Sequence, residues 1–326
     1  MTIIAVLGLN NNVISSVHPY AVSFSMKSLS FSRYVFPLLF FINNLRLFSG
    51  FKQSPLISPY RPVLHRTETA TRLNSLNRLA LDQAILPVFK KALAVDAVLA
   101  LILLQIPKTP LTKLGLLHAT ILGIGLWTFL GPKGWLAGVI YFVLGSLVTK
   151  IKFKEKERRG IAEKRGGDRG PENVWGSAAA AMVCAVLTYI KPAYSSAFTV
   201  GFIASLATKL SDTFASEIGK AYGKNTYLIT TLKMVPRGTE GAVSVEGTVA
   251  GVVGSAIMAA VGFPLGLLTS SKGFAACIIA AFIATTAESF IGAIYQDKYP
   301  WLTNELVNLI NTIIGASCAV AIMLIF

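Results

Sequence analysis

The chain has 326 residues, of which 53% are hydrophobic and 14% charged, and its mean hydropathy is +0.62. This composition is too apolar for an ordinary soluble domain of this length and predicts an integral membrane protein. The net charge of +15 does not by itself indicate that the protein binds nucleic acid. Aromatic-interleaved patterns that read bases are absent, and basic loops suit a membrane surface or a phosphorylated ligand.

The first 66 residues differ in composition from the rest of the chain. They hold six lysines and arginines in all, and ten serines lie between Ser15 and Ser58. The first acid of the chain is Glu68. A leader poor in acids that carries serine and arginine is typical of organelle import sequences, so we expect residues 1–66 to be a plastid transit peptide. The alternative is a disordered cytosolic tail with a hairpin around VFPLLFFINN.

Residues 67–91 are expected to form an amphipathic segment at the membrane surface, and residues 92–326 the transmembrane domain. Apolar runs of roughly the bilayer-spanning length, about 20 residues, recur in this domain. They cover residues 92–106, 112–130, 135–149, 174–190, 196–211, 242–268, 273–294 and 305–326. The predicted fold class is therefore all-α: a polytopic integral membrane protein of about eight helices. The first and fifth runs are short, so a re-entrant or buried segment remains an alternative for each of them.

The loops between these runs differ sharply in charge. If all eight runs cross the membrane, four charge-dense segments share one face: 107–113, 150–173, 209–240 and 295–304. The other face holds Lys133, Lys191 and Lys272 as its basic residues. Because basic loops stay on the side from which a protein is inserted, the sequence predicts one polar face, the stromal face in a plastid membrane.

The segment 150–173 begins with alternating basic and acidic residues and ends in the glycine-rich sequence RGGDRGPEN. We interpret Lys150–Arg159 as a solvated loop facing lipid head groups. Lys164, Arg165 and Arg169 are candidates for an anion site, because the glycine-rich sequence leads directly into a helix N-terminus.

Polar residues recur at helical spacing around TKLSDTFASEIGKAYGK, residues 208–224. One stripe consists of Ser205, Lys209, Asp212, Ser216 and Gly219. Glu217 is turned by about 140° from Asp212 on an ideal helix, so both acids serve one site only if the helix breaks or the site wraps around its end. The alternative for Lys209 and Asp212 is a self-neutralising pair at the bilayer edge.

The stretch TLKMVPRGTEGAVSVEGTVAG supplies Lys233, Arg237, Thr239, Glu240 and Glu246. Glu246 falls inside an apolar run, so a cation or a hydrogen-bond donor is expected beside it, because an unpaired acid in a membrane is costly. The glycines of RGTEG and EGTVAG allow the backbone to approach an oxyanion closely.

Near the end of the chain, Glu288 lies within an apolar run and Asp297 just outside it. Asn304, Asn308 and Asn311 follow at spacings of four and three, on one helix face. Such a stripe also holds helices together, but beside two acids it favours a polar pocket.

These acids, cations and amides are the groups that hold a divalent metal and a polyphosphate, and Mg²⁺ is the expected cofactor. Candidate metal ligands are Asp212, Glu217, Glu246, Glu288 and Asp297. Candidate catalytic residues are Asp212, Glu217, Arg237 and Glu240. Candidate nucleotide or phosphate contacts are Lys164, Arg165, Arg169, Lys220, Lys224, Lys233 and Thr239. The sequence has no Ser/His/Asp arrangement, Walker loop or protein-kinase signature, and its scattered cysteines and histidines suggest no zinc site.

Three stretches carry a resemblance to a known family: KLSDTFASEIGKAYGKNTYLITTLKMVPRGTEGAVSVEGTVAG, EKRGGDRGPENVWGSAAA, and AESFIGAIYQDK followed by WLTNELVNLIN. Over about residues 85–326 the chain resembles the phytyl-phosphate kinases of plants and cyanobacteria, a transmembrane family long known as a domain of unknown function. The resemblance implies conversion of phytyl monophosphate to phytyl diphosphate by a nucleoside triphosphate, expected to be CTP, in a chloroplast membrane. The product would feed tocopherol (vitamin E) and phylloquinone synthesis.

More distantly, SDTFASEIGKAYGK followed by EGTVAG is similar to CTP-using polyprenol kinases of the dolichol kinase type and to phosphatidate cytidylyltransferases. This similarity implicates Asp212, Glu217, Lys220 and Lys224 in binding the phosphates and the metal of the nucleotide. The cytidylyltransferase segment His-Gly-Gly is missing after Asp297, which disfavours CDP-lipid synthesis. The alternatives are such a synthase and a membrane transporter of an anionic substrate, although no internal repeat typical of transporters is found.

Overall fold

The computed structural model describes residues 66–105, 109–296 and 298–326, and this part of the chain is mostly helical. Its α-helices are α2 (Arg66–Gln105), α3 (Lys113–Thr149), α4 (Phe153–Arg158), α5 (Pro171–Ile190), α6 (Ser195–Tyr222), α7 (Val245–Gly262), α8 (Ser271–Ile291) and α9 (Asn304–Ile325). The short elements are η4 (Lys164–Gly167), η5 (Pro192–Tyr194), the π-helix η6 (Gly292–Gln296), and the antiparallel strands β1 (Tyr227–Leu228) and β2 (Ala242–Val243).

Five of the described helical segments are long and apolar enough to cross a membrane. They are α3, α5, α7, α8 continued by η6, and α9. The predicted fold, an all-α polytopic membrane protein, is confirmed. Each of the eight predicted apolar runs overlaps a described helix. The end points differ by a few residues for most runs, but α2 begins 26 residues before its run and α6 ends 11 residues after its run.

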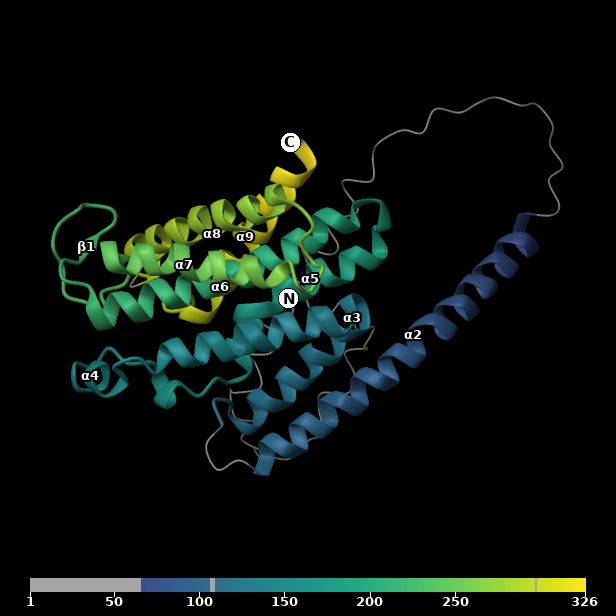
Figure 1. Cartoon of the computed structure of the whole chain (residues 1–326), viewed down its shortest axis with the longest axis horizontal. Coiled ribbons are helices and arrows are strands. Elements are labelled where there is room, and N and C mark those ends of the chain that lie inside the picture. Colours follow the sequence, from purple (N-terminus) through teal and green to yellow (C-terminus); the bar gives the residue numbers. More distant parts are fainter. Residues whose placement is uncertain (1–65, 106–108, 297) are drawn as a thin grey trace, which may run out of the picture.

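Helix α3 consists of two helices that turn back on each other (Figure 1). Gly131 at the break has φ +67° and ψ −169°, a conformation that favours glycine. The rings of Trp127 and Trp135 lie 5.6 Å apart, whereas eight residues of straight helix would separate them by about 12 Å along the axis. The predicted runs 112–130 and 135–149 are therefore separate helices that run in opposite directions.

Helix α6 forms the centre of the bundle and packs against α3, α5, α7, α8 and α9. Every residue from Val200 to Ser211 is buried. Gly247, Gly251 and Gly254 of α7 lie against α6, so these two helices approach closely, as small residues allow in membranes. Helix α6, which carries charged residues, is therefore surrounded by other helices and not by lipid.

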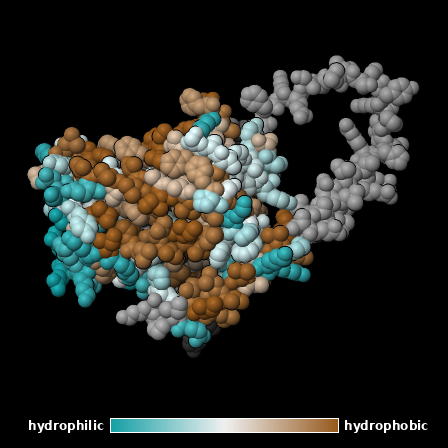
Figure 2. All heavy atoms as spheres, in the orientation of Figure 1, coloured by the Kyte–Doolittle hydropathy of each residue, from teal (hydrophilic) through white to brown (hydrophobic). Residues whose placement is uncertain are grey.

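Loops that are distant in sequence meet at one end of the bundle. Leu111 forms a parallel β-bridge with Arg169, and Gly238 packs against Ile161. We call the end formed by the loops 150–170 and 223–244 the polar end. Hydrophilic side chains gather there, around α4 and β1, beside a broad hydrophobic face of the bundle (Figure 2).

The opposite end contains the turn of α3 and the short connections between helices. Lys133 lies near Gly266 there, and Phe129 packs against Tyr189. The structure thus gathers the charge-dense segments at one end, as the loop charges predict.

The predicted transit peptide concerns residues 1–66, of which residues 1–65 lie outside the described residues. Residues 67–91 belong to α2, which begins at Arg66. From Ile85 onward its side chains are described, and Leu86, Phe89 and Leu93 are exposed apolar residues.

Candidate functional site

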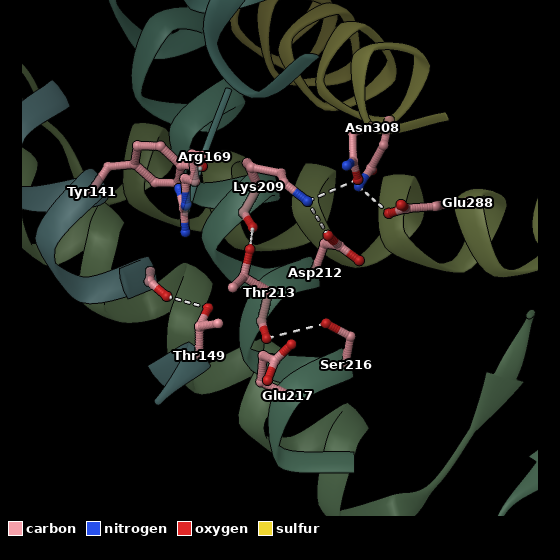
Figure 3. A network of polar contacts seen from close by, with 12 residues as sticks. Tyr141, Thr149, Arg169, Lys209, Asp212, Thr213, Ser216, Glu217, Glu288 and Asn308 are labelled. Atoms are coloured by element: carbon pink, nitrogen blue, oxygen red, sulfur yellow. Dashed lines mark hydrogen bonds and ion pairs between the residues drawn. The ribbon is translucent and has the colours of Figure 1, made fainter. Parts of the chain in front are cut away.

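A cluster of charged and amide side chains lies inside the bundle, where α6, α8 and α9 meet (Figure 3). Lys209 of α6 forms an ion pair with Asp212 one turn further along the helix. The Lys209 ammonium also donates to Asn308 Oδ1 of α9 at 2.8 Å. The self-neutralising pair considered from the spacing is therefore formed, but a third side chain from another helix joins it, and the Lys209 side chain is 10% exposed.

Glu288 of α8 completes the cluster from the opposite side. Asn311 Nδ2 donates to its carboxylate, and the carboxyl groups of Glu288 and Asp212 are close enough to interact directly. Asn311 Oδ1 is buried and has no hydrogen-bond partner among the described residues. Two neighbouring carboxylates repel, so with one ammonium beside them the cluster retains negative charge unless a cation or a proton joins it.

We call Lys209, Asp212, Glu288, Asn308 and Asn311 the central cluster. Its carboxylate and amide oxygens are the ligands that Mg²⁺ prefers. Its buried amide oxygen is a group that a bound ion could satisfy. The described residues contain no group of three or more His, Cys, Asp or Glu that would hold a metal ion by itself. A metal ion bound here would thus use two carboxylates with amide oxygens and leave positions for substrate oxygens.

Arg169 and Tyr141 lie beside the central cluster. Arg169 Nη1 donates to the Tyr141 hydroxyl at 3.3 Å, and Tyr141 lies close enough to the Lys209 ammonium to interact with it electrostatically. In Figure 3 the Lys209 ammonium lies between the Arg169 guanidinium on one side and the carboxylates of Asp212 and Glu288 on the other. Nothing in the sequence singles out Tyr141, which lies in an apolar run with no motif around it.

Glu217 belongs to a second ion pair, apart from Asp212. Helix α6 is continuous through both residues, so their side chains leave it in different directions. The Glu217 carboxylate pairs with Lys156 of α4, and both side chains are 1% exposed. The Lys156 ammonium also donates to the backbone carbonyl of Thr149 at 2.9 Å.

The interpretation of Lys150–Arg159 as a solvated loop is wrong at Lys156. Part of this segment forms α4, which contacts α6, and a lysine on that side meets the carboxylate that a buried charge requires. Lys152, Lys154 and Arg158 are exposed, as expected of a solvated segment.

The loop between α6 and α7 carries three of the seven predicted phosphate contacts, Lys224, Lys233 and Thr239, together with the candidate catalytic residue Arg237. All four are exposed at least in part. Glu246, in the first turn of α7, accepts a hydrogen bond from the backbone N–H of Lys224 at 3.2 Å, which supplies the donor expected for it. Glu240 lies close enough to Glu288 to repel it electrostatically, so this loop reaches the central cluster.

Other predicted site residues lie outside the central cluster. Arg165 pairs with Glu172 at 2.6 Å, and Lys164 is exposed beside it. Asn304 is exposed at the start of α9, and Asp297 lies outside the described residues.

The candidate metal ligands are not gathered into one site among the described residues. Asp212 and Glu288 meet in the central cluster, whereas Glu217 and Glu246 have partners of their own. Lys220 lies 4.0 Å from Glu217 and so accompanies the second ion pair.

The fold and the central cluster define a class of protein: a polytopic α-helical membrane protein with a charged site inside the bundle and a basic polar end. The chain belongs to the family described as integral membrane protein DUF92, which matches residues 96–316. The family resemblance carried by the three sequence stretches is thereby confirmed.

Relatives from three organisms are similar over most of this domain. An uncharacterised membrane protein of Synechocystis sp. is 56% identical over 217 residues, 66% of this chain and 84% of its own length. Protein VTE6, chloroplastic, of Arabidopsis thaliana is 45% identical over 247 residues, 74% of either chain. An uncharacterised membrane protein of Methanocaldococcus jannaschii is 33% identical over 209 residues, 64% of this chain and 84% of its own length. No solved structure matches the chain.

Proposed function

We propose that this protein is a membrane kinase that transfers the terminal phosphoryl group of a nucleoside triphosphate, CTP in our proposal, to phytyl monophosphate. The observation that carries the proposal is the meeting of Asp212 and Glu288 with Lys209 inside the bundle. Arg169 lies on the other side of Lys209, where it contacts Tyr141. Acids that could share a metal ion stand beside cations that could balance phosphate charge. Phosphoryl transfer depends on this combination.

The acceptor in this reaction is a phosphate monoester, which is largely ionised near pH 7, so the reaction requires no general base. An acceptor oxygen forms a bond to the γ-phosphorus of CTP, and the bond from that phosphorus to the β–γ bridging oxygen breaks. CDP leaves with the electron pair, and phytyl diphosphate remains. Because every reacting group is anionic, positioning and charge neutralisation dominate the barrier, which suits a central cluster without a nucleophile or a histidine.

Asp212 and Glu288 would hold Mg²⁺, with the amide oxygens of Asn308 and Asn311 as further ligands. A bound Mg²⁺ supplies positive charge against the phosphate oxygens. Lys209 stabilises the ionised form of Asp212 and orients Asn308 through its two contacts. Lys209 thereby keeps the ligand oxygens in place before substrate arrives.

The nucleotide would bind from the aqueous side, at the polar end. Its polyphosphate would contact Lys220 in the last turn of α6 and Lys224, Lys233 and Arg237 of the following loop, together with Thr239. In a chloroplast membrane this end would face the stroma, and the product would serve tocopherol and phylloquinone synthesis. The similarity to a plant protein that is named as chloroplastic supports the location.

One reaction separates this proposal from a transporter or a CDP-lipid synthase. The full chain, purified into lipid vesicles, is incubated with phytyl monophosphate, CTP and Mg²⁺, and the lipid and nucleotide products are identified by mass. The kinase yields phytyl diphosphate and CDP. A CDP-lipid with pyrophosphate indicates the synthase, and unchanged lipid that has moved across the vesicle membrane indicates the transporter. Either of these results contradicts the proposal.

A further inference from the structure

Arg169 is fixed in place by both its backbone and its side chain. Its N–H donates to the Pro110 carbonyl at 3.0 Å, and its carbonyl accepts from the Thr112 N–H at 3.1 Å. Its guanidinium lies 5.9 Å from the ring centre of Tyr141 and 5.5 Å from that of Phe142. The fold therefore holds this guanidinium between the segment that precedes α3 and the second half of α3.

Glycine makes room for the guanidinium. A Cβ atom at Gly145 would lie 2.9 Å from a terminal nitrogen of Arg169, which is closer than real Cβ atoms approach their neighbours. Any larger residue at this position would therefore displace the end of the arginine side chain. The absence of a side chain at Gly145 is part of how Arg169 is positioned.

Arg169 forms no ion pair with an acid among the described residues, whereas Arg165, four residues earlier, is paired with Glu172. A partly buried guanidinium without an acid is costly in a folded protein. Its rigid fork of N–H groups matches the oxygens of a phosphate group. Arg169 is therefore suited to an anion that comes from outside the chain.

The surroundings of Arg169 favour a lipid phosphate over a nucleotide phosphate. Tyr141 and Gly145 lie about two turns and one turn before the end of α3 at Thr149, so the guanidinium contacts the transmembrane part of that helix. Tyr141 then leads to Lys209 of the central cluster. A phosphate attached to a prenyl chain in the bilayer reaches this depth directly, whereas a soluble nucleotide first meets the exposed loop cations.

We propose that Arg169, with the Tyr141 hydroxyl, binds the phosphate of the prenyl monophosphate acceptor and does not bind the nucleotide. This inference rests on the proposed function and divides its site into two parts. Arg169 and Tyr141 take the acceptor, and the cations of the 223–244 loop take the donor. Lys209 lies between Arg169 and the two carboxylates, so the acceptor phosphate would be held beside the central cluster.

The test uses Arg169→Lys, which retains the positive charge and loses the fork of N–H groups, with the exposed Arg158→Lys in α4 as the matched control. Binding of phytyl monophosphate and of a non-hydrolysable CTP analogue is measured on the purified full chain in vesicles, without turnover. Arg169→Lys is expected to weaken binding of phytyl monophosphate by about tenfold or more, because a two-point charge-assisted contact is lost. Binding of the CTP analogue should stay within about twofold, and the control should change neither affinity.

Gly145→Ala is the second variant, because it leaves Arg169 and its charge present and moves only the guanidinium. The same selective loss of phytyl monophosphate binding is expected, and retained CTP-analogue binding shows that the variant is folded. Weaker binding of the CTP analogue to Arg169→Lys, or unchanged binding of phytyl monophosphate to both variants, overturns the proposal. If both variants selectively lose phytyl monophosphate binding but the wild-type chain forms no phytyl diphosphate, the kinase proposal fails and the Arg169 site stands.

Discussion

Lys156 and Glu217 form a buried ion pair at the polar end, although 61 residues separate them in the sequence. Lys156 belongs to the six-residue helix α4, and Glu217 to the central helix α6. The pair fastens the segment that leads to Arg169 onto the helix that carries Lys209 and Asp212. It therefore joins the two parts of the chain from which the site is built.

Lys156→Ala should destabilise the protein strongly, because it leaves the Glu217 carboxylate buried without its main partner. Removing one member of a buried pair costs about 3–5 kcal/mol, and thermal unfolding in detergent measures the loss. Lys154→Ala, two residues earlier and exposed, should change the free energy of unfolding by less than about 0.5 kcal/mol. Equal stability of the two variants would show that the ion pair does not hold α4 in place.

Asp212→Asn and Glu288→Gln should each lower kcat/KM by at least about 100-fold, or ~2.7 kcal/mol of transition-state stabilisation, while the protein still folds. Both changes keep shape and hydrogen bonding and remove the charge that a metal ion requires. The loss should be largest at limiting Mg²⁺. Glu157→Gln, on the exposed side of α4, is the control and should leave activity unchanged.

Full activity of Asp212→Asn at limiting Mg²⁺ would contradict a metal at this site. Asp212 would then serve only as the partner of Lys209. In that case the charges of the central cluster would act in helix packing within the membrane.

The helical fold and the gathering of charged loops at one end were predictable because both depend on residues close together in the sequence. A bilayer-spanning helix needs about 20 apolar residues, and the count of lysines and arginines in each loop places the basic segments on one face. The break in α3 was also visible, as the gap between the runs 112–130 and 135–149. The end points were less predictable: α6 continues to Tyr222 through charged residues because its burial in the bundle, not its hydropathy, stabilises it.

The candidate site was only partly predictable. Glu288 and Asp212 were recognisable because an acid within or at the end of an apolar run is costly and so suggests a function. The partners of these residues depend on contacts across 23 to 99 residues of chain, as between Lys209 and Asn308, and composition does not encode such contacts. The burial of Lys156 was missed for the same reason, since its neighbours in sequence are exposed.

Cysteines placed at Arg165 and Asn225 should react with an impermeant reagent from the same side of a sealed vesicle, and a cysteine at Ala193 from the other side. All three positions are exposed. The native cysteines are first replaced; Cys184 and Cys277 are buried. Labelling of positions 165 and 225 from opposite sides would contradict a common polar end.

A fluorescent fusion of residues 1–70 should accumulate in plastids, because this leader is basic, rich in serine and free of acids before Glu68. Microscopy in plant cells provides the measurement. A fusion that starts at residue 71 is the control and should stay outside plastids. Cytosolic or secretory fluorescence of the leader fusion would refute the plastid address.

The position of the phosphorus that CTP transfers tests the central claim most directly. The purified full chain in vesicles receives phytyl monophosphate, Mg²⁺ and CTP labelled at either the γ- or the α-phosphorus. A kinase transfers the γ label to the lipid and leaves the α label in CDP, and Asp212→Asn should reduce this transfer by at least about 100-fold. Appearance of the α label in the lipid, or of neither label, would contradict the proposed reaction.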